Sequence, residues 1–163
     1  EKHLAGRELA VDIPADLPLV EVDGVLMEQL LLNLLENAAK YTQEGSPVSI
    51  VARAARVAVV GGGGGVEITV ADRGPGLAPD ELEKVFDLFY QGREADGALG
   101  GGGGGGRKGY GIGLAICRAI ALVHGGSIRA ENREGGGALF RLTLPAPRKH
   151  RPPEEDGAKE EAL

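Results

Sequence analysis

The sequence predicts an α+β fold, a two-layer sandwich in which a mixed, mostly antiparallel sheet is covered by about three helices. Three observations lead to this class. Most strand patterns come in consecutive pairs, each joined by a glycine-rich connection. Two segments have a helical pattern of apolar residues, and a third begins with the signals of a helix start. Strands and helices do not alternate one for one, which argues against a doubly wound parallel sheet.

The N-terminal part predicts edge strands followed by a long helix. Residues 1–22 alternate short apolar pieces with prolines, which indicates one or two short edge strands. Asp23 is placed to cap a helix from Val25 to Thr42, and Gly45-Ser46-Pro47 ends this element. The apolar residues that repeat at intervals of four are Leu30, Leu34 and Ala38.

A hairpin and a second helix follow. Residues 48–60 read as one strand, and apolar residues alternate with polar ones from Val66 onward to form its partner. The pure glycine tract Gly61–Gly65 lies between them, and we expect it to be a flexible loop that does not pack. Pro79 then starts a helix that runs to about Phe86, with acidic residues in its first turn.

The C-terminal half predicts a lid, a third helix and a second hairpin. Residues 90–108 have no periodicity and contain the glycine tract Gly100–Gly106, which indicates a mobile loop or lid. Residues 112–124 are again helical, and Gly125 is placed to cap their C-terminus. The two final strands span residues 127–132 and 138–144.

Length and composition narrow the class of protein. The 163 residues suit one domain over residues 1–147, and we expect the charged, proline-containing residues 148–163 to form a disordered tail. A net charge of −6 and the absence of Trp argue against a nucleic-acid partner. The single cysteine, Cys117, excludes an internal disulfide and a multi-cysteine zinc site. No signal-peptide pattern and no long apolar run occur, so we expect no direct membrane contact by this domain.

A polar stripe interrupts the apolar pattern of the long helix. Asn33 and Asn37 lie four residues apart, and Lys40 and Tyr41 continue the same face. A solvated helix face would have this composition. A site for a phosphate chain and its metal would also have it, because an amide oxygen suits Mg²⁺ and lysine is a point charge for phosphate.

Two glycine-containing segments add further candidates. Asp72-Arg73-Gly74-Pro75-Gly76 directly follows a strand, where Asp72 could accept a hydrogen bond from the exocyclic amine of adenine, although an ordinary turn has the same composition. Gly109-Tyr110-Gly111-Ile112-Gly113 opens the third helix, where exposed backbone N–H groups attract phosphate. Its late position is not that of a dinucleotide fold, and the P-loop signature is absent.

The order of these segments resembles the catalytic, ATP-binding domain of bacterial sensor histidine kinases, which has the Bergerat fold of the GHKL ATPases. Residues 33–42 resemble the N box of that family, residues 72–77 the G1 box, residues 86–89 the F box and residues 109–116 the G2 box. All four occur in the family's order and at its spacing. The resemblance covers about residues 8–146.

The end of the chain resembles the potassium-responsive, KdpD-type branch of these kinases. The similar stretches are residues 117–120, 124–126 and 134–141. Many histidine kinases have Ser or Thr where this chain has Ala138, two residues before Phe140. One hydroxyl that could contact phosphate is therefore absent, while the backbone N–H donors remain.

The resemblance implies a reaction and a set of site residues. The domain would bind ATP with Mg²⁺ and transfer the γ-phosphoryl to a histidine on its own kinase's separate dimerisation and phosphoacceptor domain, for onward transfer to a KdpE-like response regulator. The domain would be cytoplasmic, in a kinase anchored in the inner membrane. The implied catalytic residues are Asn33, Glu36 and Lys40. The implied metal ligand is Asn37. The implied nucleotide contacts are Asn37, Tyr41, Asp72, Gly74, Gly76, Gly109, Gly111, Gly113 and Leu114.

Two other functions stay open at this point. ATP hydrolases of the same fold place a Glu where this chain has Asn33, and a carboxamide cannot accept a proton from water. The neighbouring Glu36 is the candidate base for such a reaction. A degenerate kinase that binds nucleotide without catalysis is the second alternative. We expect no phosphoacceptor in this chain, because His3, His124 and His150 all lack the sequence context of one.

Overall fold

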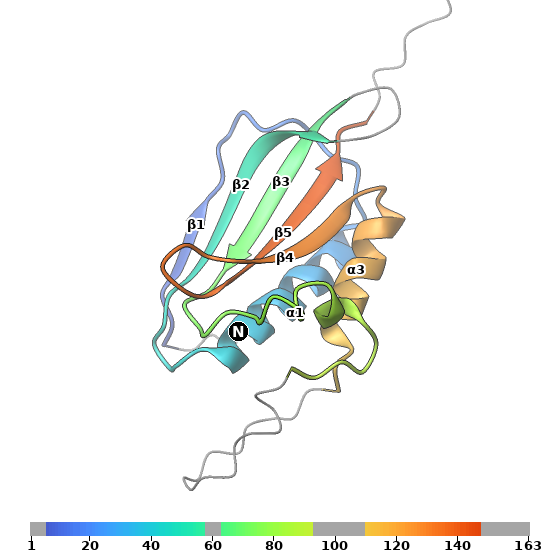
Figure 1. Ribbon diagram of the computed structural model, residues 1–163. Helices are drawn as coiled ribbons and strands as arrows, with labels where there is room; N and C mark the ends of the chain where they lie inside the picture. The colour runs from blue at the N-terminus through green and yellow to red at the C-terminus, as the bar shows by residue number, and fades with distance from the viewer. Residues whose placement is uncertain (1–5, 58–62, 93–109, 148–163) are drawn as a thin grey trace, which may run out of the picture.

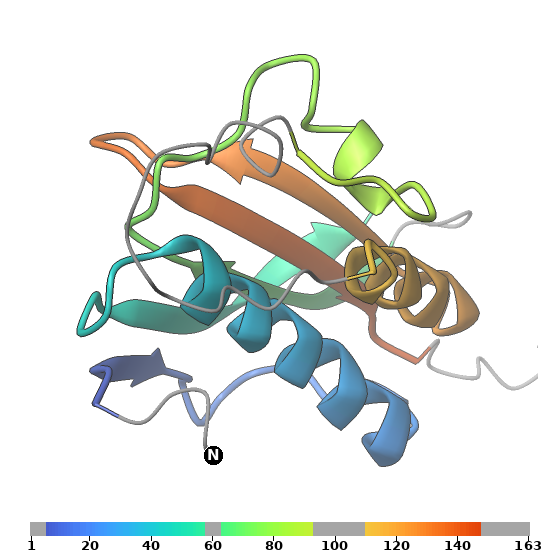
Figure 2. The same ribbon diagram turned by 90° about the horizontal axis from the view of Figure 1, so that it is seen from below.

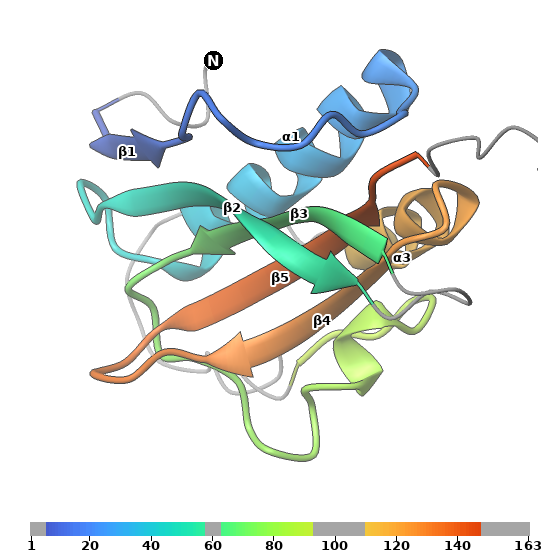
Figure 3. The same cartoon turned by 90° about the horizontal axis from the view of Figure 1, so that it is seen from above.

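The computed structural model describes residues 6–57, 63–92 and 110–147. Five strands form one sheet: β1 (Leu9–Asp12), β2 (Val48–Val57), β3 (Gly63–Ala71), β4 (Ser127–Asn132) and β5 (Ala138–Pro145). Their order across the sheet is β1-β2-β3-β5-β4 (Figure 1). β1 runs parallel to β2, and every other neighbouring pair is antiparallel. β1 and β4 therefore form the two edges of the sheet (Figure 3).

Two α-helices of the described residues, α1 (Gly24–Tyr41) and α3 (Gly113–Val123), pack side by side against one face of the sheet (Figure 2). The other face is polar in part: Arg141 of β5 forms ion pairs there with Glu67 of β3 and Glu131 of β4. The predicted α+β two-layer sandwich with a mixed, mostly antiparallel sheet is confirmed.

Both helices begin or end where the sequence places their caps. The Asp23 side chain accepts hydrogen bonds from the backbone N–H groups of Val25 and Leu26 at 2.8 and 3.0 Å, which fixes the first turn of α1. At the end of α3, Gly125 has φ +67°. The N–H groups of Gly125 and Gly126 bond back to the last carbonyls of the helix, each at 2.9 Å, in a Schellman motif.

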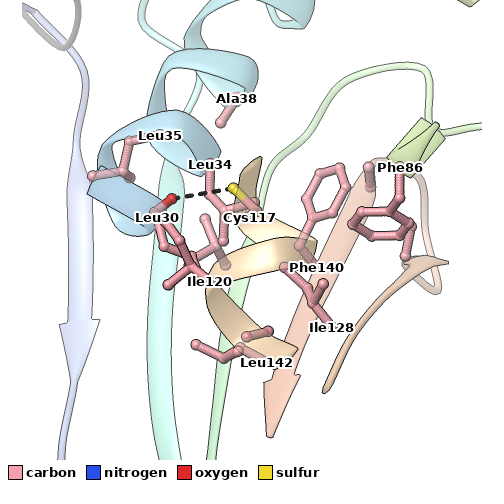
Figure 4. Close-up of a cluster of buried hydrophobic side chains, with 14 of the residues drawn as sticks. Leu30, Leu34, Leu35, Ala38, Phe86, Cys117, Ile120, Ile128, Phe140 and Leu142 are labelled. Atoms are coloured by element: carbon pink, nitrogen blue, oxygen red, sulfur yellow. Dashed lines mark hydrogen bonds between the residues drawn. The ribbon is translucent and has the colours of Figure 1, made fainter. Parts of the chain in front are cut away.

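The core lies between the helices and the sheet (Figure 4). Leu30 and Leu34 of α1 are fully buried, as their spacing predicts, and Phe86 packs edge-on against Phe140 with ring centroids 6.3 Å apart. Cys117 of α3 is 0% exposed, and its thiol donates to the Leu30 carbonyl oxygen at 3.5 Å. Cys117 therefore packs as a small hydrophobe.

The helix predicted from Pro79 to Phe86 is wrong. These residues form turns that end in the short 3-10 segment η1 (Lys84–Phe86). The Glu81 side chain is buried and turns back to accept from the Ala78 N–H at 3.0 Å and from the Tyr90 hydroxyl at 2.9 Å. Tertiary bonds of this kind override the helix signal of so short a segment. The helices therefore number fewer than predicted over the described part of the chain.

The first glycine tract also differs from the prediction. Its last three residues, Gly63–Gly65, belong to β3 and pair with β2. A Cβ atom on Gly65 would lie 2.2 Å from the Leu144 carbonyl oxygen and 2.4 Å from a Val57 methyl group. This part of the tract therefore packs closely, because neighbouring strands approach where no side chain intervenes.

Two further predictions concern residues outside the described part of the chain. Residues 93–109, which hold most of the predicted lid and the tract Gly100–Gly106, lie outside the described residues, as does the predicted tail, residues 148–163. Where the chain is described, no helix is both long and apolar enough to cross a membrane.

Candidate functional site

The polar stripe of α1 meets the start of α3. Asn33 is half-buried, and its amide nitrogen donates to the Gly113 carbonyl oxygen at 3.3 Å while its amide oxygen accepts from Gln29 at 3.2 Å. A Cβ atom on Gly113 would lie 3.7 Å from the Asn33 side chain. α3 therefore begins in van der Waals range of the Asn33 side chain. Both bonds also commit the carboxamide of Asn33 to positioning rather than to proton transfer.

The next residues of the stripe are more open. Asn37 is half-buried, and its carboxamide makes no hydrogen bond within the described part of the chain. Lys40 donates to the Tyr41 hydroxyl at 3.0 Å, and its ammonium lies 4.7 Å from the centre of the Tyr41 ring. Glu36 is exposed on a neighbouring face of α1. Asn37 and Lys40 are thus available to a ligand at little cost in lost contacts.

The Asp72 turn is held much more tightly. Asp72 is 6% exposed, and its Oδ1 atom accepts from the backbone N–H groups of Gly74 at 2.8 Å and Ala138 at 3.1 Å. The Asp72 N–H in turn donates to the Ala138 carbonyl oxygen at 3.0 Å. The second oxygen, Oδ2, has no partner among the described residues and is not sealed from solvent. One oxygen fixes the carboxylate, and the other is free to accept from a ligand.

Glycines join this turn to the end of α1. A Cβ atom on Gly74 would lie 2.7 Å from the Tyr41 carbonyl oxygen. Gly76 has φ +79°, and a Cβ atom there would lie 2.7 Å from Asn132 Oδ1. Neither position accepts a side chain without a shift of backbone or partner. The turn at Asp72 therefore lies directly against the end of α1, where the polar stripe ends at Tyr41.

The start of α3 completes the site. Gly111 has φ +67°, and a Cβ atom there would lie 2.5 Å from the Tyr90 carbonyl oxygen. Ile112 precedes α3 without a capping side chain, so the first N–H groups of the helix are available to an anion beside Asn33. Leu114 is half-buried and packs on the core, which makes its side chain structural. Gly109 lies outside the described residues.

Three residues that sequence reasoning missed support the site. Asn132 bonds the Leu77 backbone in both directions, each at 2.8 Å, and Arg133 donates to the Asp72 carbonyl oxygen at 2.9 Å. A hydrogen-bonding side chain just before a glycine-rich turn was the available signal. Arg7 donates to the carbonyl oxygens of Ala39 at 2.8 Å and Thr42 at 3.2 Å. That contact spans more than thirty residues, and no local pattern predicts it.

The donor set decides which metal fits. Over the described ranges, no group of three or more His, Cys, Asp or Glu side chains could hold an ion. Asn37 offers a single neutral oxygen. Such a set fits Mg²⁺, which keeps several waters and shares phosphate oxygens, and does not fit a metal that needs an all-protein cage. A hollow of about 500 Å³ near His124 involves none of the predicted site residues.

The chain is similar in sequence to known ATPases and sensor kinases. Residues 22–148 match the family described as "Histidine kinase-, DNA gyrase B-, and HSP90-like ATPase". The sensor protein KdpD of Escherichia coli K12 is 42% identical over 135 residues, which cover 83% of this chain and 13% of KdpD. The chain thus spans about an eighth of that relative's length.

Solved histidine kinases have a similar fold. The mycobacterial sensor histidine kinase MprB superposes with a TM-score of 0.67 at 26% identity, over 90% of this chain and 87% of that one. Full-length ShkA in complex with AMPPNP gives a TM-score of 0.65 at 33% identity, over 88% of this chain and 26% of ShkA.

Proposed function

The chain belongs to the family of histidine kinase-, DNA gyrase B- and HSP90-like ATPases, and from this premise we propose that it binds Mg-ATP for phosphoryl transfer to a histidine. The acceptor histidine would lie on the separate dimerisation and phosphoacceptor domain of a two-component sensor kinase. A KdpE-like response regulator would then receive the phosphoryl group. The named sensor kinases among the relatives support this branch of the family.

One observation carries the proposal: contacts link Asp72, through Gly74 and the end of α1, to Asn33 and the start of α3. An open carboxylate oxygen at one end suits the exocyclic amine of adenine. Helix N–H groups at the other end suit phosphates. ShkA, one of the similar structures, was solved with an ATP analogue.

We assign roles to the residues along this path. Asp72 accepts a hydrogen bond from the exocyclic amine of adenine, and Gly74 and Gly76 let the base lie close to the backbone. Tyr41 covers the sugar or base, and Lys40 leaves the tyrosine hydroxyl to meet phosphate. These groups bind and orient the nucleotide.

The remaining roles concern the phosphate chain. Asn37 holds Mg²⁺, which neutralises charge on the phosphates when bound. Asn33 keeps the start of α3 in place. The N–H groups around Gly111, Gly113 and Leu114 cradle the phosphates, with Gly109 on the chain just before them. Glu36 is the candidate base.

The bonds of Asn33 favour transfer to a protein over hydrolysis. An amide cannot take a proton from water, and both polar atoms of Asn33 are already engaged. An acceptor histidine, by contrast, supplies its own nucleophilic nitrogen for in-line attack. The phosphorus–nitrogen bond forms as the bond to ADP breaks, so positioning provides most of the catalysis.

The proposal is tested with γ-labelled ATP and Mg²⁺. The chain alone should bind ATP but carry no label, since we expect none of its histidines to be an acceptor. Adding the dimerisation and phosphoacceptor domain of the KdpD relative should give acid-labile label on that domain. The matched control is the same domain with its acceptor histidine replaced. Acid-labile label on this chain alone would contradict the missing acceptor, and rapid phosphate release without any acceptor would favour hydrolysis.

Localisation and stimulus are inferred from the same relative. We propose that this domain works on the cytoplasmic side of an inner-membrane kinase of the potassium-responsive KdpD type. Cell fractionation of the complete kinase checks the first statement. Phosphorylation of the acceptor at low and high potassium checks the second.

A further inference from the structure

Asn132 at the end of β4 and Arg133 in the following turn form hydrogen bonds with the two ends of the Asp72 segment. The Asp72 N–H still bonds the Ala138 carbonyl oxygen of β5, and after it residues 73–78 leave the sheet and pair with no strand. The side chain of Asn132, the last residue of β4, replaces such a strand. Its Oδ1 atom accepts from the Leu77 N–H and its Nδ2 atom donates to the Leu77 carbonyl oxygen, both at 2.8 Å. The carboxamide thus bonds both the N–H and the C=O of one residue, as a residue of a neighbouring antiparallel strand would.

Arg133 holds the other end of the same segment. Its Nη1 atom donates to the Asp72 carbonyl oxygen at 2.9 Å, and the Arg133 N–H donates to the Gly137 carbonyl oxygen at 2.8 Å. A hydrogen bond from a charged donor is stronger than one between neutral groups. Arg133 is therefore fixed within its own turn while it fixes the main chain of Asp72.

Close packing leaves this arrangement little freedom. A Cβ atom on Gly137 would lie 2.2 Å from the Asp72 carbonyl oxygen, and one on Gly76 would lie 2.7 Å from Asn132 Oδ1. The N–H group of the next residue, Ala138, donates to Asp72 Oδ1 at 3.1 Å. The direction in which the free oxygen of Asp72 points is therefore set by the β4–β5 turn.

We propose that Asn132 and Arg133 are positioning residues for base selectivity: they hold the Asp72 turn so that Oδ2 faces the amine of a bound purine. The inference rests on the proposed ATP site. Selectivity is sensitive to such support, because a hydrogen bond weakens steeply when its angle falls away from linearity. Loss of either residue should relax the choice of base while leaving the contacts to phosphate intact.

The test compares binding of ATP and ITP to the folded chain. ITP carries an oxygen where ATP carries the exocyclic amine, and the two share the same triphosphate. Asn132→Ala should weaken ATP binding by about tenfold, with ITP binding changed much less, so the preference for ATP collapses. The matched control is Glu134→Ala, an exposed residue of the same turn, which should keep the wild-type preference.

A second pair of variants separates positioning from stability. Arg133→Lys keeps a charged donor for the Asp72 carbonyl oxygen and should retain the preference, whereas Arg133→Met should lose it. Equal loss of ATP and ITP binding, or an unchanged preference in Asn132→Ala and Arg133→Met, would overturn the inference. If the wild-type chain bound neither nucleotide, the proposed function itself would be wrong.

Discussion

The two ends of the proposed nucleotide site differ in how many of their bonds exist before any ligand arrives. At the base end, Asp72 makes four hydrogen bonds through its carboxylate and main chain, to Gly74, Ala138 and Arg133. At the phosphate end, the Asn37 side chain makes none with the described residues, and the Lys40 side chain bonds only its neighbour Tyr41. The base end is preorganised, and the phosphate end gains its partners from the ligand.

This difference separates selectivity from affinity. A fixed acceptor discriminates between bases because it cannot turn to suit a wrong partner. Open polar side chains on a helix surface have no fixed geometry to lose, so they contribute through the charge and the metal that they bind. The first two predictions below each act on one end of the site and should leave the other unchanged.

The largest effect is expected from Asn37→Ala at the phosphate end. Removal of the only amide oxygen offered to Mg²⁺ should weaken Mg-ATP binding by on the order of a hundredfold or more. The fold should be unchanged or slightly more stable, because Ala is the better helix former and the Asn37 carboxamide makes no hydrogen bond with the described residues. Calorimetric titration with and without Mg²⁺, alongside thermal unfolding, measures both.

The matched control is Gln43→Ala, which truncates another exposed carboxamide just beyond α1. It should leave binding unchanged. Unaltered phosphoryl transfer in Asn37→Ala would show that Asn37 is not the Mg²⁺ ligand. It would also contradict the inference that the phosphate end gains its partners only when the ligand binds.

A smaller effect, confined to the base, is expected from Asp72→Asn. The new carboxamide oxygen can still accept from Gly74 and Ala138, so the turn should hold. The second position becomes a donor that opposes the amine of adenine. Loss of a charged hydrogen bond there should cost about 1–3 kcal/mol, or about 5- to 150-fold in Kd for ATP. Binding of GTP, whose ring carries an acceptor at that place, should fall less, and an intact preference for ATP would mean that Asp72 has another role.

The sequence predicted the parts of the site that depend on local pattern. The stripe from Asn33 to Tyr41 follows from helical spacing, and the turns at Asp72 and Gly111 follow from glycine and strand ends. The bonds that unite them join residues far apart in the chain, such as Asn132 to Leu77, and no local pattern contains them.

The fold shows the same division. The caps of α1 and α3 and the strand β5 follow from local sequence and were predicted. The local sequence from Pro79 to Phe86 predicts a helix, but the hydrogen bonds of the buried Glu81 side chain hold this segment in turns. Glycines read locally as linkers, yet Gly65 is fixed by Leu144 and Val57 from other strands. Tertiary contacts decided both exceptions.

The contact between the two ends gives a third prediction. In Gly74→Ala the new Cβ would lie 2.7 Å from the Tyr41 carbonyl oxygen, so the turn or the end of α1 must move. We expect a loss of about 1–3 kcal/mol in the free energy of unfolding. ATP binding should weaken at both ends together. Gly24→Ala is the control, since a Cβ there meets nothing within 4 Å. If Gly74→Ala changed neither stability nor binding, the two ends would be independent.

The smallest effect concerns the packing beneath the phosphate end. Cys117 is 0% exposed between α3 and α1, and burial raises the pKa of its thiol from 9.0 to about 12. Below pH 9 the thiol is protonated in both the folded and the unfolded chain, so its ionisation does not change the free energy of unfolding. Above pH 9 only the unfolded chain loses the proton, so the folded state loses stability as the pH rises.

Comparison with Cys117→Ala isolates this contribution from the other groups that titrate at high pH. Between pH 8 and pH 10 the wild-type chain should lose about 1 kcal/mol more unfolding free energy than Cys117→Ala. Urea unfolding of both chains at each pH gives the difference. Parallel curves would mean that the thiol ionises in the folded chain, which requires α1 and α3 to separate while the site is empty. We expect only the side chains of the phosphate end to gain new partners when the ligand binds. The helices α1 and α3 that carry them should already be packed together in the free chain.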